Sequence, residues 1–125
     1  MPKVSAKTAA NVADFGAAID RNETLDDTAV SFVEIKQTHD LGAMLAGLPG
    51  GHCSCPHWGY MFKGRLTVQY ADHEEVFEAG DAFYMTPGHV PAAEAGSEFV
   101  QFSPAKEMAE TEAAIRAFMQ SQAQS

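Results

Sequence analysis

Two histidines and two cysteines are the residues of this chain whose types and spacing could do chemistry. Cys53, Cys55 and His57 alternate within one short segment, and His89 follows a Pro-Gly pair further along the chain. Imidazoles and thiolates bind transition metals, and imidazoles also transfer protons near neutral pH. Because His52 precedes Cys53, four potential metal donors fall within six consecutive positions.

The two cysteines are expected to be reduced. One residue separates Cys53 from Cys55, which is too short a span for an easy disulfide, and two cysteines do not make a secreted disulfide scaffold. Each thiol could be a metal ligand or a small, half-buried hydrophobic group in a turn. For His57 the alternative to a ligand is a structural histidine that packs beside Trp58 and hydrogen-bonds to the backbone.

Short antiparallel strands must position these side chains. Between residues 30 and 104, runs of alternating apolar and polar residues are separated by turn residues at close intervals. Leu66, Val68 and Tyr70 alternate with polar side chains, which is the period of a strand with one buried face. The pattern predicts an all-β sandwich or barrel over residues 30–104, preceded by an arm or short helix over residues 1–29.

The C-terminal segment, residues 105–125, has helical spacing instead. Ser103 could cap a helix with Pro104 at its first position. One stripe with helical spacing then runs through Met108, Glu112, Ile115, Phe118 and Met119. We expect an amphipathic helix that packs on the outside of the barrel or on a second subunit, followed by a frayed tail.

Length and charge limit the classes of function. The chain has 125 residues, of which 46% are hydrophobic and 20% charged, and this composition fits one globular domain. Its formal net charge of −9 repels phosphate backbones and anionic membrane surfaces, so neither nucleic acid nor a membrane is an expected partner. The sequence has neither a long apolar run nor an apolar leader at its start, and we therefore expect a cytoplasmic protein.

The two histidine-bearing segments resemble the paired sequence motifs of the cupin superfamily, the small RmlC-like jelly-roll barrels. Gly64 fits the glycine that closes the first motif, and Gly80 and Gly88 fit the second motif. The resemblance covers roughly residues 48–104 and is greatest to small bacterial cupins of unassigned activity. It implies an all-β, cupin-type double-stranded β-helix, here with an N-terminal arm and a C-terminal helix, and commonly a divalent metal between the two motifs.

The ligand positions of the family are only partly kept. Counting back from Gly64, the family's glutamate falls on His57, and its two histidines do not both fall on histidines. In the second motif, Pro91 takes the position of the family's histidine. His89 stands two residues earlier and could therefore point inward from the same face of a strand.

A substitute metal site could be built from His57, His89, Cys53 and Cys55. This set favours zinc, because zinc takes imidazole and thiolate ligands in a tetrahedron. Iron, nickel or copper could also bind, with fewer thiolate ligands.

Other side chains could complete a pocket around such a metal. Tyr60 and Tyr84 are candidate proton donors to a substrate. Phe62, Phe83 and Gln101 are candidates for lining a cavity that holds a small organic molecule. Barrel cores also need aromatic side chains as filler, so each of the aromatic residues has a purely structural alternative.

These features support one leading function and two alternatives. The first is a metal-dependent enzyme of oxygenase, isomerase, lyase or cyclase type that converts a small organic molecule inside the barrel. The second is a metabolite-binding or sensing module without a metal, and the third is a metal-free isomerase or cyclase that uses His57 and His89 as an acid and base pair. An exposed edge strand and an N-terminal arm would also favour a homodimer.

Overall fold

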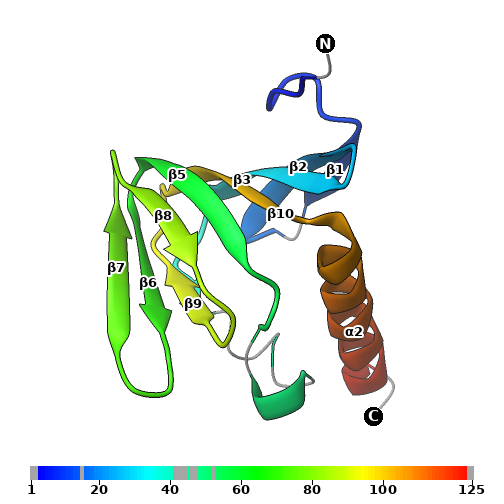
Figure 1. The fold of residues 1–125 in the computed structure, drawn as a ribbon, viewed down its shortest axis with the longest axis vertical. Coiled ribbons are helices and arrows are strands. Elements are labelled where there is room, and N and C mark those ends of the chain that lie inside the picture. The colour runs from blue at the N-terminus through cyan, green and yellow to red at the C-terminus, as the bar shows by residue number, and fades with distance from the viewer. Residues whose placement is uncertain (1–2, 15, 41–44, 46–47, 52, 124–125) are drawn as a thin grey trace.

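Two facing β-sheets with one long helix at their side make up the protein in the computed structural model (Figure 1). The structure describes residues 3–14, 16–40, 45, 48–51 and 53–123. Every strand pair between its named strands is antiparallel. The predicted all-β fold class with a C-terminal helix is confirmed.

The larger sheet has six strands and the smaller sheet has four. In spatial order, the larger sheet consists of β1 (Asn11–Asp14), β2 (Ala18–Leu25), β3 (Thr28–Ile35), β10 (Glu98–Pro104), β5 (His57–Lys63) and β8 (Ala82–Met85). The smaller sheet consists of β4 (His39–Asp40), β9 (Val90–Ala93), β6 (Arg65–Gln69) and β7 (Glu74–Glu78). A short 3-10 turn, η1, spans Pro49–Gly51, and the helix α2 spans Ala105–Ala123.

The apolar core is formed by side chains that the two sheets direct toward each other. Met61 of β5 and Leu66 and Val68 of β6 are almost completely buried within it. Phe83 of β8 stacks on Phe77 of β7 with ring centroids 4.8 Å apart. Because buried and exposed residues alternate along these strands, the predicted period-two pattern is confirmed for this part of the chain.

The N-terminal region differs from the expected arm or short helix. It contains β1 and β2 instead, and β2 pairs with β3 along its whole length, from Ala18 opposite Ile35 to Leu25 opposite Thr28. Both faces of β2 carry polar side chains, so its sequence lacks the alternation that marks a half-buried strand. The strand conformation of this segment is therefore determined by its pairing with β3 and not by a pattern of hydrophobic residues in its own sequence.

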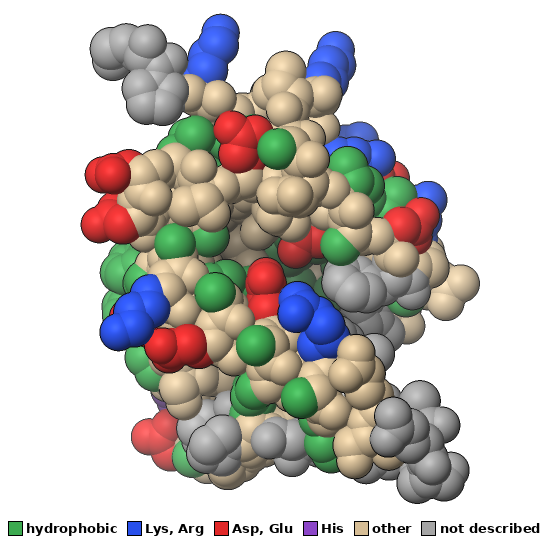
Figure 2. All heavy atoms as spheres, turned by 90° about the vertical axis from the view of Figure 1, so that its right-hand side faces the viewer, with side chains coloured by type: hydrophobic (Ala, Val, Ile, Leu, Met, Phe, Trp, Pro, Cys, Tyr) green, Lys and Arg blue, Asp and Glu red, His purple; other side chains and the backbone are tan. Residues whose placement is uncertain are grey.

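Helix α2 packs on its own chain through one side. Met108 and Ile115 contact a small buried cluster that contains Cys53, Cys55 and Leu45. On the face that carries α2, acidic, basic and hydrophobic side chains are mixed (Figure 2). The expected stripe is thus partly confirmed, whereas the side chain of Met119 lies outside the described residues. Among the described residues, none of the helices has both the length and the apolar character needed to cross a membrane.

The turn between β5 and β6 fits tightly against a buried serine. Gly64 has a φ of +79°, and a Cβ atom there would lie 2.6 Å from the Cα of Ser97. The Ser97 hydroxyl accepts a hydrogen bond from the Arg65 amide at 3.0 Å and donates one to the Arg65 carbonyl at 3.1 Å. The turn therefore requires glycine both for its backbone conformation and for space.

We predict that Gly64→Ala destabilises the protein by about 3 kcal/mol, because it combines an unfavourable φ with a clash against Ser97. Gly80→Ala is the matched control: Gly80 has a φ of +94°, but an added Cβ would meet no atom within 4 Å. It should cost only about 1 kcal/mol. Urea denaturation of both variants measures the difference, and equal losses of stability would contradict the packing role of Ser97.

Candidate metal centre

Backbone pairing brings the two histidine-bearing segments together. Cys53 and His89 form an isolated antiparallel bridge, in which the Cys53 amide donates to the His89 carbonyl at 3.0 Å and the His89 amide donates to the Cys53 carbonyl at 3.2 Å. His57 is the first residue of β5 and is buried. Two further residues on the same face of the strand follow it: Gly59 is half-buried and Met61 is buried. The segment before β5 and the residue before β9 therefore meet at one end of the sandwich.

Three of the four predicted ligands converge there. The ligand atoms of Cys53, His57 and His89 all lie within 4.8 Å of one another. The Cys53 Sγ is 3.9 Å from the His57 Nε2, and the two imidazole ring centroids are 4.9 Å apart. The three residues are 5%, 5% and 1% exposed, respectively. A buried thiol and two buried imidazoles in contact form a site from which water is largely excluded.

Each imidazole is oriented through its Nδ1 atom. The His89 Nδ1 donates to the Thr86 carbonyl at 2.6 Å, and its lone pair is therefore on Nε2. The His57 Nδ1 lies 2.6 Å from the Ser103 Oγ, and the lone pair is on Nε2 when Nδ1 carries the proton. Partners of this kind fix the ring orientation and the tautomer of metal-binding histidines.

Burial also sets the protonation of the cluster. It lowers the pKa of His57 to about 3, with the neighbouring His89 as the second cause. The His57 ring is therefore neutral near pH 7, which is the form that binds metals. Burial raises the pKa of the Cys53 thiol, and hydrogen bonds with the Cys55 backbone and the Thr111 side chain of α2 partly offset this increase. The thiol has to lose its proton before it can bind a metal.

Cys55 stands apart from this cluster although it was predicted as a ligand. Its Sγ lies 3.7 Å from the Pro56 carbonyl and 4.0 Å from the Met108 Sδ, against helix α2. Burial, followed by the charges of Cys53, Glu107 and Glu112, raises its pKa to about 12. Equal parity with Cys53 suggested a shared face, but residues 54–56 are not part of a strand, so parity does not decide where the Cys55 thiol points. Its surroundings fit the alternative reading of Cys55 as a small hydrophobic group that contributes to packing.

The separations within the cluster fit a metal ion. Zinc bonds of about 2.3 Å to sulfur and about 2.0 Å to nitrogen, at a tetrahedral angle, place the two ligand atoms about 3.5 Å apart. The 3.9 Å between the Cys53 Sγ and the His57 Nε2 is close to this value. One thiolate and two imidazoles also leave one tetrahedral position for water or a substrate atom.

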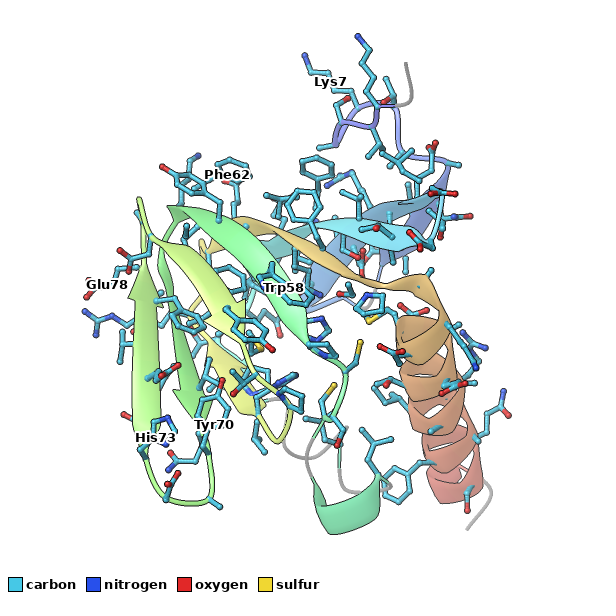
Figure 3. All side chains as sticks on the ribbon, in the orientation of Figure 1. Lys7, Trp58, Phe62, Tyr70, His73 and Glu78 are labelled. Carbon is cyan, nitrogen blue, oxygen red and sulfur yellow. The ribbon has the colours of Figure 1, made fainter. Side chains whose placement is uncertain are left out.

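The predicted proton donors lie away from the cluster. Tyr60 and Tyr84 are 42% and 46% exposed and belong to the outer face of the larger sheet. Phe62, a predicted cavity residue, lies on the same outer face and points away from the smaller sheet (Figure 3). Side chains alternate along a strand, so residues three and five positions after His57 must face the opposite side. The expectation that Tyr60, Tyr84 and Phe62 face the inside of the barrel is therefore wrong.

The other two predicted cavity residues are directed inward but do different things. Phe83 is part of the apolar core, where its ring also meets Phe99 in an edge-on contact with centroids 6.3 Å apart. Gln101 is half-buried on β10, opposite Gly59 of β5 and on the same face as Ser103. Gln101 thus remains near the candidate site, whereas Phe83 acts as core filler.

An open cavity of about 520 Å³ lies beside the loop that carries His89. Its lining includes Tyr70, His73, Thr86 and Val90, and the first two lie at the β6–β7 hairpin (Figure 3). The rings of Tyr70 and His73 stack with centroids 4.7 Å apart. Phe62, Phe83 and Gln101 do not line this cavity.

Sequence reasoning missed two contributors to the site. Ser103 was expected to cap the C-terminal helix, but it lies within β10, and the helix begins at Ala105. Its parity with Gln101 on the last strand is the signal that could have placed it inward. Thr111, which hydrogen-bonds with Cys53, belongs to the helix and had no such signal. His52, which the sequence offered only as a potential donor, lies outside the described residues.

Comparison with protein families and with curated proteins found no match to this sequence. Solved structures do resemble it. An RmlC-like cupin from Shewanella frigidimarina is 16% identical with a TM-score of 0.55, and the match covers 78% of this chain and 86% of that one. The polyketide cyclase RemF from Streptomyces resistomycificus is 13% identical with a TM-score of 0.57, covering 84% of this chain and 80% of that one.

A larger enzyme contains a similar unit. A mutant of the oxalate decarboxylase OxdC from Bacillus subtilis is 18% identical with a TM-score of 0.60 over 81% of this chain, which corresponds to 28% of that enzyme. At these identities the likeness concerns the fold. Together with the two antiparallel sheets and the inward-facing histidines, it identifies the architecture: the chain has the cupin fold.

Proposed function

We propose that this chain is a small metal-dependent enzyme that holds a divalent ion, preferably zinc, between Cys53, His57 and His89. The observation that carries the proposal is the convergence of three buried donor groups from two separate segments within 4.8 Å. Zinc is favoured over iron and nickel because a thiolate and two imidazoles are its usual ligands, and copper is the next best fit to this donor set. Such an ion would polarise a substrate oxygen or activate a water molecule.

The residues of the chain have distinct roles in this proposal. Ser103 and the Thr86 carbonyl orient the two imidazoles so that Nε2 of each can bind. Helix α2 covers Cys53 and excludes water from the thiol. The cavity beside the His89 loop could hold a small organic molecule; its lining includes Tyr70 and His73 but none of the three candidate ligands.

The type of reaction and the substrate stay open within the oxygenase, isomerase, lyase and cyclase classes. The polyketide cyclase and the oxalate decarboxylase among the similar structures are enzymes with small organic substrates, which supports this general class. A metal-free acid and base pair is less favourable, because a pKa of about 3 makes His57 a poor proton donor at neutral pH. A metabolite-binding module without metal is the remaining alternative. The cytoplasmic location stays a prediction.

Metal analysis tests the proposal directly. Protein dialysed against zinc and then against metal-free buffer should retain about one ion per chain. Cys53→Ala should weaken zinc affinity by more than about a hundredfold because it removes a direct ligand, and Cys55→Ala is the matched control that should leave affinity unchanged. Competition with a zinc-sensitive dye measures both variants. No bound zinc in the unmodified protein, or equal effects of the two substitutions, would refute the site.

Ser103 provides a second test, because its only proposed effect on the metal is through the orientation of His57. We expect Ser103→Ala to weaken zinc affinity by about 10- to 100-fold and Ser103→Thr to retain it. Ser31→Ala is the control. Ser31 is similarly buried on β3, the strand that pairs with β10, but its side chain hydrogen-bonds with Asp20. Equal affinity in Ser103→Ala and the unmodified protein would show that the His57–Ser103 contact does not serve the metal.

The metal-free protein should lose stability in acid because His57 is buried in its neutral form. Its pKa is about 3 in the folded state and near 6.5 when unfolded, so the unfolded chain binds a proton first as the pH falls. The free energy of unfolding is therefore unaffected by His57 well above pH 6.5 and decreases as the pH falls toward 3. At pH 5 the decrease amounts to about 2 kcal/mol. Urea unfolding at pH 7.5 and pH 5 should show this difference, and His57→Gln should reduce it.

The matched control for this measurement is the exposed His73. Its pKa is raised by a hydrogen bond to Asp72, so its contribution has the opposite sign. His73→Gln should keep the loss of stability in acid. The explanation fails if His57→Gln and the unmodified protein lose the same free energy between the two pH values.

A further inference from the structure

The loop between β8 and β9 carries His89 but has little apolar packing of its own. It spans residues 86–89, in which Thr86 and Pro87 are exposed, Gly88 is half-buried and His89 is buried. A segment with few buried apolar contacts opens easily unless other interactions hold it. The position of the His89 ring therefore depends on the hydrogen bonds at the two ends of this loop.

The end of the loop at His89 is held by the segment before β5. The Cys53 carbonyl accepts hydrogen bonds from the Gly88 amide at 2.8 Å and from the His89 amide at 3.2 Å. These bonds fix the backbone, whereas the direction of the imidazole ring also depends on its side-chain dihedral angles. The bond from the His89 Nδ1 to the Thr86 carbonyl at 2.6 Å orients the ring, so the start of the loop has to be fixed as well.

Thr86 lies just beyond the point where strand pairing stops. The last pair between β5 and β8 is His57 opposite Met85, and the residue before His57 is Pro56, which has no amide hydrogen to continue the ladder. Backbone groups at such a point need partners from elsewhere. The Thr86 amide donates to the Tyr70 hydroxyl at 3.1 Å, and its carbonyl accepts the bond from the imidazole.

The Tyr70 hydroxyl is a well-fixed acceptor. Tyr70 follows β6 directly, is 9% exposed and belongs to the apolar core between the sheets. Its ring stacks on that of His73, with centroids 4.7 Å apart and planes inclined by 9° (Figure 3). Its amide also donates to the His73 carbonyl at 2.8 Å, which closes the β6–β7 hairpin. The smaller sheet thus presents this hydroxyl to the His89 loop in a defined place.

We propose that Tyr70 is a positioning residue of the candidate metal centre, whose hydroxyl acts through Thr86 to hold the His89 ring with Nε2 directed to the ion. As far as the ion is concerned, this inference rests on the proposed function. The effect on the ring is a property of the metal-free protein and can be measured there. Tyr70 itself is not among the three converging donor residues.

Loss of the hydroxyl isolates this effect from packing. Tyr70→Phe keeps the ring in the core and its stacking on His73, but it leaves the Thr86 amide without its acceptor. An amide without a partner turns toward water, and the exposed Thr86 has room to do so. Its carbonyl moves with it, so the His89 Nδ1 loses the acceptor that selects its tautomer.

Nuclear magnetic resonance of the imidazole nitrogens tests this in metal-free protein. In the unmodified protein the proton of His89 should reside on Nδ1. Tyr70→Phe should shift the ratio of the two tautomers toward the form protonated on Nε2 by about tenfold, which corresponds to the loss of one net hydrogen bond. Tyr84→Phe is the matched control, because Tyr84 is 46% exposed on the outer face of β8. An unchanged His89 spectrum in Tyr70→Phe, or equal changes in both variants, overturns the proposal.

Zinc affinity gives the second measurement. Tyr70→Phe should weaken it by about three- to tenfold, which is less than expected for Ser103→Ala because Tyr70 acts through one more residue. Tyr84→Phe should leave it unchanged. If the unmodified protein binds no zinc, the metal centre itself is refuted, and the tautomer of His89 still decides whether Tyr70 orients the ring. Unchanged zinc affinity in Tyr70→Phe, in a protein that does bind zinc, refutes the positioning role.

Hydrogen exchange of the unmodified protein avoids any effect of substitution on folding. The Thr86 amide should exchange with deuterium at least about tenfold more slowly than an unprotected amide, because its hydrogen bond to Tyr70 has to open first. Exchange of this amide at the unprotected rate would mean that the bond is not maintained in solution, and the inference would then be wrong.

Discussion

The paired backbone hydrogen bonds between Cys53 and His89 are the constraint on which the candidate site depends. They connect the segment that leads into β5 with the loop that leads into β9, and these strands belong to different sheets. Without this bridge, the imidazole of His89 would not be held beside His57. Because both bonds join main-chain atoms, the contact does not depend on the identity of either side chain. The chain can therefore place a thiol and an imidazole there without changing the fold.

Strand β5 serves two surfaces through simple alternation. His57 and Met61 face the space between the sheets, whereas Trp58 and Tyr60 face outward. The inward side combines a candidate metal ligand with core packing, and the outward side carries exposed aromatic rings. A shift of one residue in the register of β5 would exchange these two sets of side chains. The closely packed turn at Gly64, which follows β5 directly, restricts such a shift.

Much of the fold could be predicted because its strands alternate in hydrophobicity between turn residues, as around Leu66 and Val68. Strand β2 could not be predicted in this way, because it is polar on both faces and acquires its conformation by pairing with β3. The convergence of His57 and His89 followed from the family resemblance. The displacement of Cys55 toward α2 depends on the direction of the chain at Pro56, and the contact between Ser103 and His57 depends on strand register. Neither is encoded in local sequence.

The junction between β10 and α2 has a mechanical consequence. Ser103 contacts the His57 ring, and the helix begins two residues later, with only Pro104 between them. Proline fixes its own φ and resists bending, so this connection is short and stiff. A displacement of the first turn of α2 would therefore move the Ser103 hydroxyl relative to the His57 imidazole. The position of the helix would in this way be coupled to the orientation of a candidate metal ligand.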